Sequence, residues 1–450
     1  MTKVVVLELN ELNFEAVEHY VARGALPHFA AFLQCHGFCE TTSETLYEEL
    51  EPWIQWVTVH TGRSFADHGI FRLGDVVASD TPQIWEHMER ELQLTVGAVS
   101  PMNAANRASR PAFFIPDPWT PTPASGSWLT RRLSGAVSQA VNDNASGVMT
   151  GSTIGILLLG LARFGLAQNY GVYAGLGMGA LRRPWNRVSF LDLFLSDVFI
   201  GLTKKTRPQF STLFLNGAAH LQHHYMFNSP ACANGQANPS WYIGQGLDPV
   251  GHIYAVYDRI LGSVQRALPD YRVLIITGLH QDPYAAPEYY WRLRDHAGFL
   301  RSLGLQFEDV QPRMSRDFLV RFAARSDLES AADVILGARI GEDQAFSVEK
   351  RENDIFVQLV FPHEITDATT LRAGDIVVEN LKKHVVFVAL KNGHHSAIGY
   401  FSDSGRRSNE LPRSIPLTQV YDEILAIFRN SAGAHHRSAS APAEPLRERI

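Results

Sequence analysis

Four apolar segments of this 450-residue chain are each followed by a cluster of polar residues. Runs rich in Val, Leu, Ile and Phe without alternation are typical of parallel strands that are buried on both faces. In a parallel sheet, functional groups gather beyond the carboxyl ends of the strands, so the four clusters are predicted to share one site. The segments are 3–9, 209–215, 272–277 and 384–390, and the clusters are Asn10-Glu11, 216–224, 277–281 and 393–395.

Strands alternate with stretches of helical periodicity through most of the chain. This pattern predicts an α/β fold, with a mostly parallel sheet covered by helices on both faces. We expect a single domain over residues 1–429, with a helical insertion at about 120–205 and an α+β insertion at about 300–380. The last residues, 430–450, are rich in Ser, Ala, His and Arg and are expected to be disordered.

Composition excludes some classes of partner. The formal net charge of −6 gives no electrostatic reason to expect nucleic acid or an anionic membrane surface. Three cysteines favour a reducing compartment, and the N-terminus does not fit a signal peptide, so we expect a cytoplasmic protein. The most apolar stretch, 154–162, is about half a membrane span, which indicates a buried helix or a lipid-facing patch and not a transmembrane segment.

The segment 216–224 has the densest ligand chemistry in the sequence. Asn216 and His220 are four residues apart, and so are His220 and His224. If the chain turns helical after Asn216, these three side chains share one face, where an amide oxygen and two imidazoles could bind a metal. The alternative is a polar helix start with solvated histidines, and the segment alone leaves both interpretations open.

The order and spacing of the clusters resemble the alkaline phosphatase superfamily, particularly its phosphodiesterase and sulfatase branches. The resemblance covers about 1–110, 207–285 and 384–428 and implies the fold of that family. The matching elements are Asn10-Glu11 at the first strand end, a helix from Pro52 to Thr61-Gly62, His68-Gly69-Ile70 after it, Asn216 with His220, Thr277 to Gln281, and Gly393 to Ser396.

The departures from the family pattern concern charge and the nucleophile. Two positions where the family has Asp ligands carry Asn10 and Asn216 here, and neutral Asn is a poor ligand for a dication because it supplies no charge. Where the family has a hydroxyl nucleophile, this chain has Pro52 preceded by Glu51. Glu51 is a candidate catalytic residue that could act as a metal ligand or as a general base for water in place of the nucleophile. The alternative is that the helix dipole favours a carboxylate at this helix N-terminus. The resemblance implies one or two divalent metal ions, with zinc the expected element. The candidate ligands are His220, His224, His280, His395, Glu11, Asn10 and Asn216, and the candidate substrate contacts are Arg63 and His394.

These residues predict a metal-dependent, hydrolase-like enzyme that acts on a phosphate or sulfate ester. The expected substrate is a small-molecule or saccharide-linked anionic ester, such as a phosphodiester or a sugar conjugate. Two alternatives stay open at this stage. One is an inactive member of the superfamily that binds a glycan or a partner protein, and the other is a transferase that uses a sugar acceptor.

Overall fold

The computed structural model describes residues 2–142, 150–232, 235–313 and 316–439, with side chains up to residue 430 of the last helix. The chain divides into two compact units. The first comprises Met1–Gln222, Asp248–Asp282 and His395–Ile450, and the second comprises His223–Leu247 and Pro283–His394. The division falls inside helix α10 (Gly217–Tyr225) and strand β16 (Val385–Ser396), so each of these elements contributes residues to both units.

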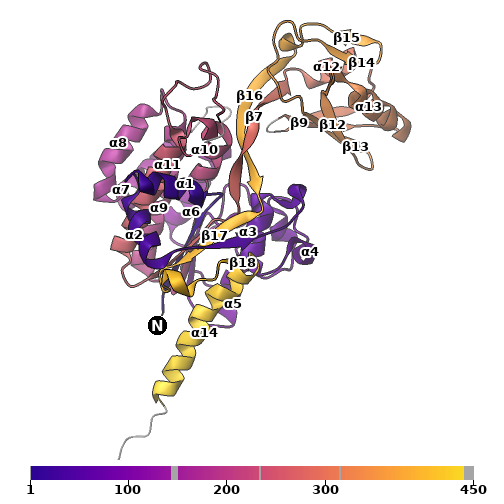
Figure 1. Cartoon of the computed structure of the whole chain (residues 1–450). Helices are drawn as coiled ribbons and strands as arrows, with labels where there is room; N and C mark the ends of the chain where they lie inside the picture. The colour runs from indigo at the N-terminus through magenta and orange to yellow at the C-terminus, as the bar shows by residue number, and fades with distance from the viewer. Residues whose placement is uncertain (1, 143–149, 233–234, 314–315, 440–450) are drawn as a thin grey trace, which may run out of the picture. The chain divides into compact units, whose positions relative to one another are not determined.

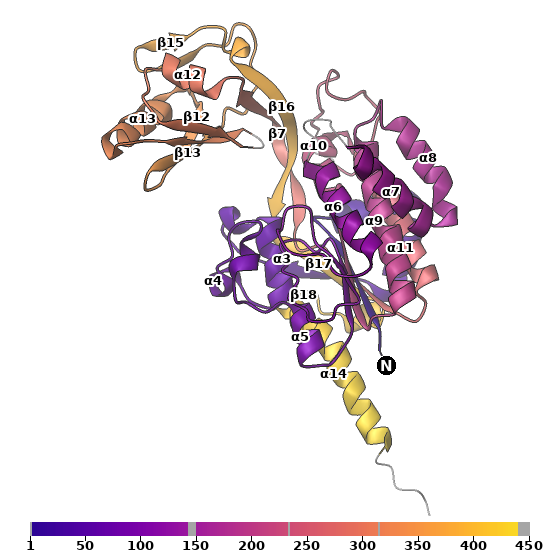
Figure 2. The ribbon, with the colours of Figure 1, turned by 180° about the vertical axis from the view of Figure 1, so that it is seen from behind.

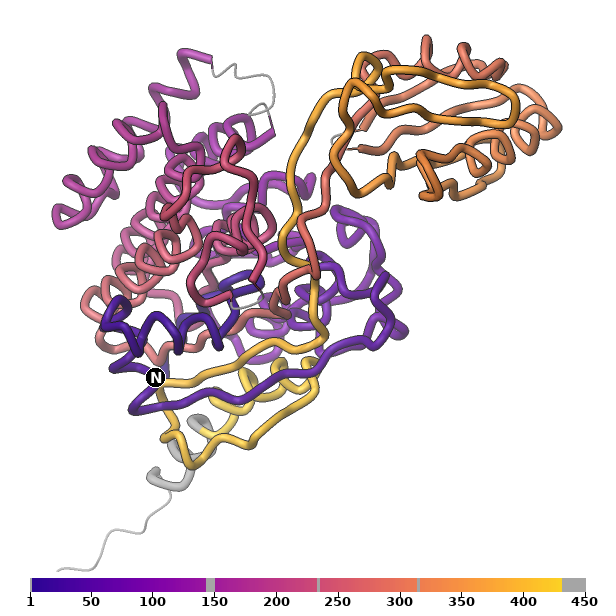
Figure 3. The backbone as a smooth tube through the Cα atoms, turned by 45° about the horizontal axis from the view of Figure 1, so that its top comes forward, coloured from indigo at the N-terminus to yellow at the C-terminus, as the bar shows by residue number. Residues whose placement is uncertain are grey.

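An eight-stranded sheet forms the centre of the first unit, in the order β18-β2-β17-β6-β1-β5-β3-β4. The five strands from β6 to β4 are parallel to their neighbours, whereas β17 runs antiparallel to both β6 and β2. Figure 3 shows β2 and β17 side by side, although they are far apart in the sequence. The strands are β1 (Val4–Leu9), β2 (Cys39–Thr42), β3 (Val96–Val99), β4 (Phe113–Ile115), β5 (Phe210–Leu215), β6 (Arg272–Ile276), β17 (Ile398–Asp403) and β18 (Ser414–Pro416).

Helices cover both faces of this sheet (Figures 1 and 2), which confirms the predicted α/β class. Helices α3, α5 and α14 bury Trp56, Trp85 and Ile424 against one face, in a core shared with Val4 and Val6 of β1. On the other side α9 packs on β5 and β3, and α11 packs on α9 and α2. The helices are α1 (Phe14–Ala22), α2 (Pro27–His36), α3 (Pro52–Thr61), α4 (Phe65–His68), α5 (Ile84–Arg90), α11 (Pro249–Ala267) and α14 (Gln419–Ala439).

Among the described residues, four α-helices lie in the segment where a helical insertion was expected. They are α6 (Trp128–Asn142), α7 (Gly151–Phe164), α8 (Tyr170–Gly179) and α9 (Trp185–Thr206). Within the described residues, no helix is long and apolar enough to cross a membrane. At the other end of the chain, α14 continues to Ala439, through the first residues of the segment expected to be disordered, and residues 440–450 lie outside the described part.

The second unit is built on two small antiparallel sheets and a two-stranded ribbon. Its apolar core includes Phe318, Phe346 and Val357. One sheet contains β8 (Asp309–Pro312), β9 (Asp317–Arg321), β12 (Phe346–Lys350) and β13 (Asp354–Leu359), and the other contains β10 (Arg339–Ile340), β11 (Asp343–Gln344), β14 (Leu371–Ala373) and β15 (Ile376–Val378). The ribbon pairs β7 (His280–Leu293) with β16, and the helices are α12 (His296–Ser302) and α13 (Arg325–Gly337).

One strand assignment from the sequence is wrong. Residues 384–390 were expected to form a strand of the core sheet, but residues 385–390 belong to β16, which pairs with β7 in the ribbon. The chain rejoins the core sheet only at β17. The apolar run is equally consistent with a ribbon strand, because hydrophobic content alone does not identify the neighbour of a strand.

A buried acid–base pair lies below the site end of the sheet. Glu8 of β1 and His60 of α3 are 2% and 1% exposed, and His60 Nε2 lies 3.0 Å from Glu8 Oε1. The Thr212 hydroxyl also donates to that oxygen, at 2.5 Å. Glu8 is therefore held by two partners from neighbouring elements, in a region that excludes water.

Replacing His60 with leucine is expected to lower the free energy of unfolding by about 3–5 kcal/mol, because it leaves a buried carboxylate without its main partner. Denaturant unfolding measures this loss, and the double variant Glu8→Leu/His60→Leu should recover much of it. His87→Leu is the matched control, since His87 is only partly buried and lies 3.3 Å from an exposed carboxylate of Glu91. Equal losses in the two single variants would contradict a special role for the buried pair.

Candidate functional site

Three of the four polar clusters follow adjacent parallel strands. Because β5, β1 and β6 are neighbours in register, Asn10, Asn216 and Thr277 emerge at the same edge of the sheet. The fourth cluster reaches this edge by a different route. In β17 Phe401 lies opposite Ile276, the last residue of β6, so this antiparallel strand begins at the edge where β6 ends. His395, just before β17, therefore arrives beside the other three clusters.

Glu11 lies at the centre of this edge and is 2% exposed. Its φ of 56° is in the left-handed region, and the chain turns here after β1. The backbone N–H of Glu11 donates to Thr277 O (3.1 Å). The carboxylate accepts hydrogen bonds from two amides, at Oε1 from Asn10 Nδ2 (3.0 Å) and at Oε2 from Gln281 Nε2. The Glu11 carbonyl accepts from Gln222 Nε2 of α10 (2.7 Å). Both the carboxylate and its backbone are thus fixed.

Asn10 and Asn216, which stand where the family has Asp, bond to each other. Asn10 Nδ2 donates to Asn216 Oδ1 (2.8 Å) as well as to Glu11, and Asn10 Oδ1 accepts from Trp56 Nε1 (2.7 Å). Aspartate at position 10 could accept from Trp56, but it could not donate to Glu11 or Asn216. In this arrangement the two asparagines orient the carboxylate of Glu11.

Two imidazoles complete a possible ligand group. His395 Nε2 lies 3.3 Å from Glu11 Oε2, and His395 Nδ1 lies 3.7 Å from Glu51 Oε2. One ligand atom from each of Glu11, His223 and His395 lies within 4.8 Å of the other two. His223 is carried by α10, which the first unit holds through its residues up to Gln222. A carboxylate with two imidazoles is a known donor set for catalytic zinc.

Helix α10 is positioned at its first residue by Asp192 of α9. The Asp192 carboxylate accepts from the Gly217 N–H (2.7 Å) and from the Tyr257 hydroxyl (2.7 Å). Full burial raises the pKa of Asp192 to about 6, and these hydrogen bonds partly offset that rise. A side chain at position 217 would collide with the carboxylate, so glycine is required at this close approach.

The other predicted ligands occupy different positions. His220 is exposed, and His224 Nδ1 lies 2.8 Å from Leu390 O. His280 is buried, with Nδ1 2.7 Å from Ile398 O and Nε2 3.1 Å from Asp282 Oδ1, so both of its ring nitrogens have partners in the protein. None of these three belongs to the ligand group found among the described residues.

The two predicted substrate contacts are also separate from that group. Arg63 is exposed and follows the C-terminus of α3, whereas Glu51 caps its N-terminus, and ten helical residues span about 15 Å. The ring of His394 lies 5.0 Å from that of Tyr284.

His223 was missed from the sequence, where His220 and His224 were selected for their spacing of four. A usable signal was present, because residues seven apart also share a helix face, and His223 is seven residues after Asn216. What the sequence did not supply was the rotation of the helix, which decides whether position 220, 223 or 224 faces Glu11.

His68, in the motif that follows α3, has a structural role. Its Nδ1 accepts from the Ile70 N–H (3.0 Å), which leaves Nε2 as the protonated nitrogen, 3.3 Å from Thr58 Oγ1. Burial lowers the pKa of His68 to about 4, so the ring is neutral at pH 7. It holds the turn that begins at Gly69, whose φ is 63°.

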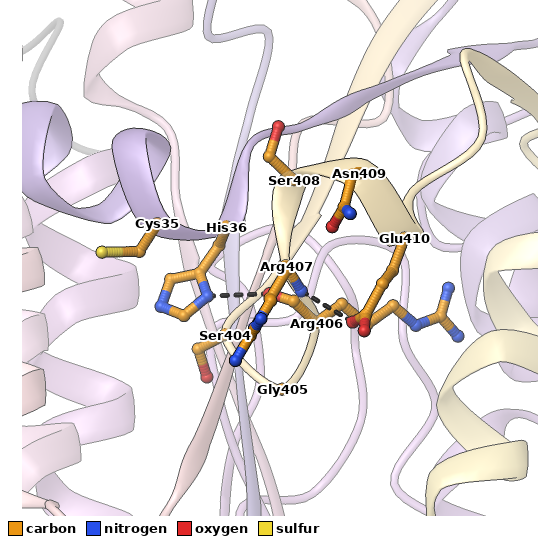
Figure 4. A pocket seen from close by; sticks show the side chains of 9 residues that line it. All are labelled: Cys35, His36, Ser404, Gly405, Arg406, Arg407, Ser408, Asn409 and Glu410. Carbon is orange, nitrogen blue, oxygen red and sulfur yellow. Dashed lines mark hydrogen bonds between the residues drawn. The ribbon is translucent and has the colours of Figure 1, made fainter.

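A pocket of about 660 Å³ lies at the opposite edge of the sheet, where the parallel strands begin (Figure 4). Two of its charged groups have partners within the protein: Arg406 pairs with Glu423 and with Asp403, and the Glu410 carboxylate accepts from the backbone N–H of Arg407 (2.8 Å). His36 Nδ1 lies 2.8 Å from Arg406 O. Although it is a large cavity, it contains none of the polar strand ends and is not the candidate site.

Comparison with known proteins finds remote structural similarity. No family model and no curated protein sequence matches the chain. The structure is similar to phosphonoacetate hydrolase from Sinorhizobium meliloti 1021 in complex with phosphonoacetate, with 11% identity, a TM-score of 0.43, and coverage of 93% of this chain and 94% of that one. It is also similar to human ectonucleotide pyrophosphatase/phosphodiesterase 5, with 10% identity, a TM-score of 0.46, and 95% of both chains covered.

Asn10→Asp tests the arrangement of amides around Glu11. Without metal, we expect this variant to lose about 1–3 kcal/mol of unfolding free energy, because two donors are lost and a second carboxylate adjoins Glu11. Unfolding in the presence of a chelator measures the loss, and added zinc should reduce it by neutralising the paired carboxylates.

Asn409→Asp provides the control, since Asn409 is exposed and a surface change of this kind is expected to stay within about 0.5 kcal/mol. Unchanged stability of Asn10→Asp under chelation would show that the amide donors at position 10 are dispensable.

Proposed function

We propose that this protein is a metal-dependent hydrolase that cleaves a phosphate or sulfate ester, with a phosphodiester as the preferred class. The observation that supports this most directly is the group formed by Glu11, His223 and His395. Two imidazoles and one carboxylate leave a fourth position of a tetrahedral zinc open, which is the pattern of catalytic sites.

The geometry of the donor atoms fits such an ion. Donors about 2.0–2.2 Å from a tetrahedral zinc lie about 3.3–3.6 Å from each other. The separation of His395 Nε2 from Glu11 Oε2 is 3.3 Å. The ligand atoms of all three residues lie within 4.8 Å of one another.

The proposed metal ligands have the hydrogen-bond partners that are usual for metal-binding side chains. His223 Nδ1 lies 2.9 Å from Gly393 O, so this nitrogen carries the proton and Nε2 keeps its lone pair. Metal-binding histidines usually donate their second N–H to a carbonyl or a carboxylate in this way. The Glu11 carboxylate is similarly oriented by the amides of Asn10 and Gln281.

The net charge of the site favours a monoanionic substrate. A dication with one carboxylate and two neutral imidazoles leaves a charge of about +1, which matches a phosphodiester better than a dianionic monoester. Bound there, the metal would polarise a non-bridging oxygen and acidify a water molecule. We favour one ion over two, because Asn10 and Asn216 hydrogen-bond to each other and supply no charge for a second.

In the absence of a hydroxyl nucleophile, the attacking group is water and Glu51 is its general base. It is the N-cap of α3, its side chain is 35% exposed, and its Oε2 lies 3.7 Å from His395 Nδ1. A carboxylate in this position reaches solvent while it stays beside a proposed metal ligand. Its role is to accept the proton of the attacking water, for which no hydroxyl side chain is needed. We also propose a saccharide-linked alcohol half for the ester and a cytoplasmic location for the protein.

Alanine at His223 or His395 is expected to reduce bound zinc from about one ion per chain to well below half, and to lower hydrolysis of bis(4-nitrophenyl) phosphate at least about 100-fold. Mass spectrometry of metal in the dialysed protein and a colorimetric assay measure the two effects. Unfolding curves should show that both variants stay folded, because the two side chains are only partly buried.

His220→Ala is the matched control, because His220 lies on the same helix and is exposed. We expect it to retain zinc and activity. Loss of zinc in His220→Ala, with retention in His223→Ala, would instead support the ligand choice made from the sequence. Absence of both zinc and hydrolysis in the wild-type protein would favour a binding protein without catalysis.

Glu51→Gln separates catalysis from metal binding. Because Glu51 is proposed to accept a proton and not to bind the ion, this variant should keep its zinc and its KM while kcat falls about 100- to 10,000-fold. A variant that loses zinc together with activity would identify Glu51 as a ligand.

A further inference from the structure

The helical insertion exposes an unusual amount of apolar surface on α7 and α8. Met178 and Leu181 are 75% and 89% exposed, and Leu158 is 61% exposed. The other exposed members are Ile154, Leu159 and Tyr170. Large apolar side chains exposed to this extent indicate an interaction surface. We call these six residues, of which Leu181 lies just after the end of α8, the apolar surface of α7 and α8.

This surface is presented by well-packed helices. Gly160 of α7 lies so close to Leu133 and Phe194 that a Cβ there would collide with both. The turn between α7 and α8 is fixed by Asp197 of α9, which accepts from the Leu166 N–H (2.8 Å), Asn169 Nδ2 (2.8 Å) and the Tyr173 hydroxyl (2.8 Å). Exposure of the leucines is therefore a property of the folded insertion.

The charge around this surface is positive, in contrast to the rest of the chain. Residues 118–191 contain six arginines and one aspartate, a net charge of +5 in a chain whose net charge is −6. The arginines, all exposed, are Arg131, Arg132, Arg163, Arg182, Arg183 and Arg187. The whole-chain charge, which gave no reason to expect an anionic membrane partner, conceals this local excess.

We propose that the apolar surface of α7 and α8 binds an anionic lipid bilayer peripherally. Exposed leucines with surrounding arginines match the apolar interior and the negatively charged headgroups of such a surface. Helix α7, with 14 residues, is about 21 Å long and cannot span a hydrocarbon core of about 30 Å, so it lies in the interface. A second copy of the chain is a poorer occupant, because a symmetric contact would face two positive surfaces against each other.

Flotation with vesicles tests this proposal. The purified full-length protein is mixed with vesicles of phosphatidylcholine alone, or with 30% phosphatidylglycerol as an order-of-magnitude model of an anionic leaflet. We expect binding to the anionic vesicles that weakens at least about tenfold in neutral vesicles or at 0.5 M salt, roughly the range where screening becomes short.

Variants assign the binding to this surface. Leu158→Glu and Leu181→Glu should each weaken partition at least about tenfold, and Arg182→Gln/Arg183→Gln about 10- to 30-fold. The controls are Val377→Glu, an exposed apolar residue of the second unit, and Lys204→Gln/Lys205→Gln, an exposed cation pair on α9. These controls should bind as the wild type does, and hydrolysis of a water-soluble diester should be unchanged in all of them.

Three outcomes would overturn the proposal. One is a wild-type protein that does not float with anionic vesicles, and another is equal binding by the leucine variants and the wild type. The third is a doubled molar mass in light scattering that Leu158→Glu reduces to the monomer, which would assign the surface to a second copy of this chain.

Discussion

The candidate site depends on one buried carboxylate, that of Glu11. Removing a carboxylate from water costs several kcal/mol unless charges or hydrogen bonds replace the lost hydration. Here Asn10 and Gln281 provide those hydrogen bonds, and Gln222 holds the backbone carbonyl of the same residue. These partners come from the end of β1, the start of β7 and helix α10. The side chain and backbone of one residue therefore receive hydrogen bonds from three separate segments.

Much of this convergence could be predicted from the sequence, because it follows from strand direction. Apolar runs that end in Asn10 and Asn216 indicate parallel strands, and parallel strands bring their ends to one edge of the sheet. The structure shows that these two strands are neighbours. The arrival of His395 at that edge was predicted for a partly wrong reason. The residues before it were taken as another core strand, whereas the antiparallel direction of β17 brings His395 there. A local sequence pattern indicates that a strand is present. It does not indicate which strand pairs with it, because pairing depends on long-range packing.

The choice among the histidines of α10 could not be predicted, because it depends on the rotation of the helix about its axis. That rotation is fixed by Asp192 and Tyr257, which contact the first residues of α10 but lie about 25 and 40 positions away in the sequence. Asn216 was likewise expected as a weakened ligand. Its hydrogen bond to Asn10 shows that the two asparagines orient Glu11, a role that the sequence alone does not reveal.

Helix α9 supports both the candidate site and the apolar surface through two buried aspartates. Asp192 fixes the start of α10, and Asp197, five residues later, fixes the turn between α7 and α8. Burial raises the pKa of both, to about 6 for Asp192. Because the unfolded chain loses the Asp192 proton near its ordinary pKa, the contribution of this residue to stability decreases as pH rises from about 4 to 6. Each aspartate nevertheless accepts a hydrogen bond from a backbone N–H group. Interactions of the same kind therefore position the proposed ligand His223, through Asp192, and the leucines exposed on α7, through Asp197.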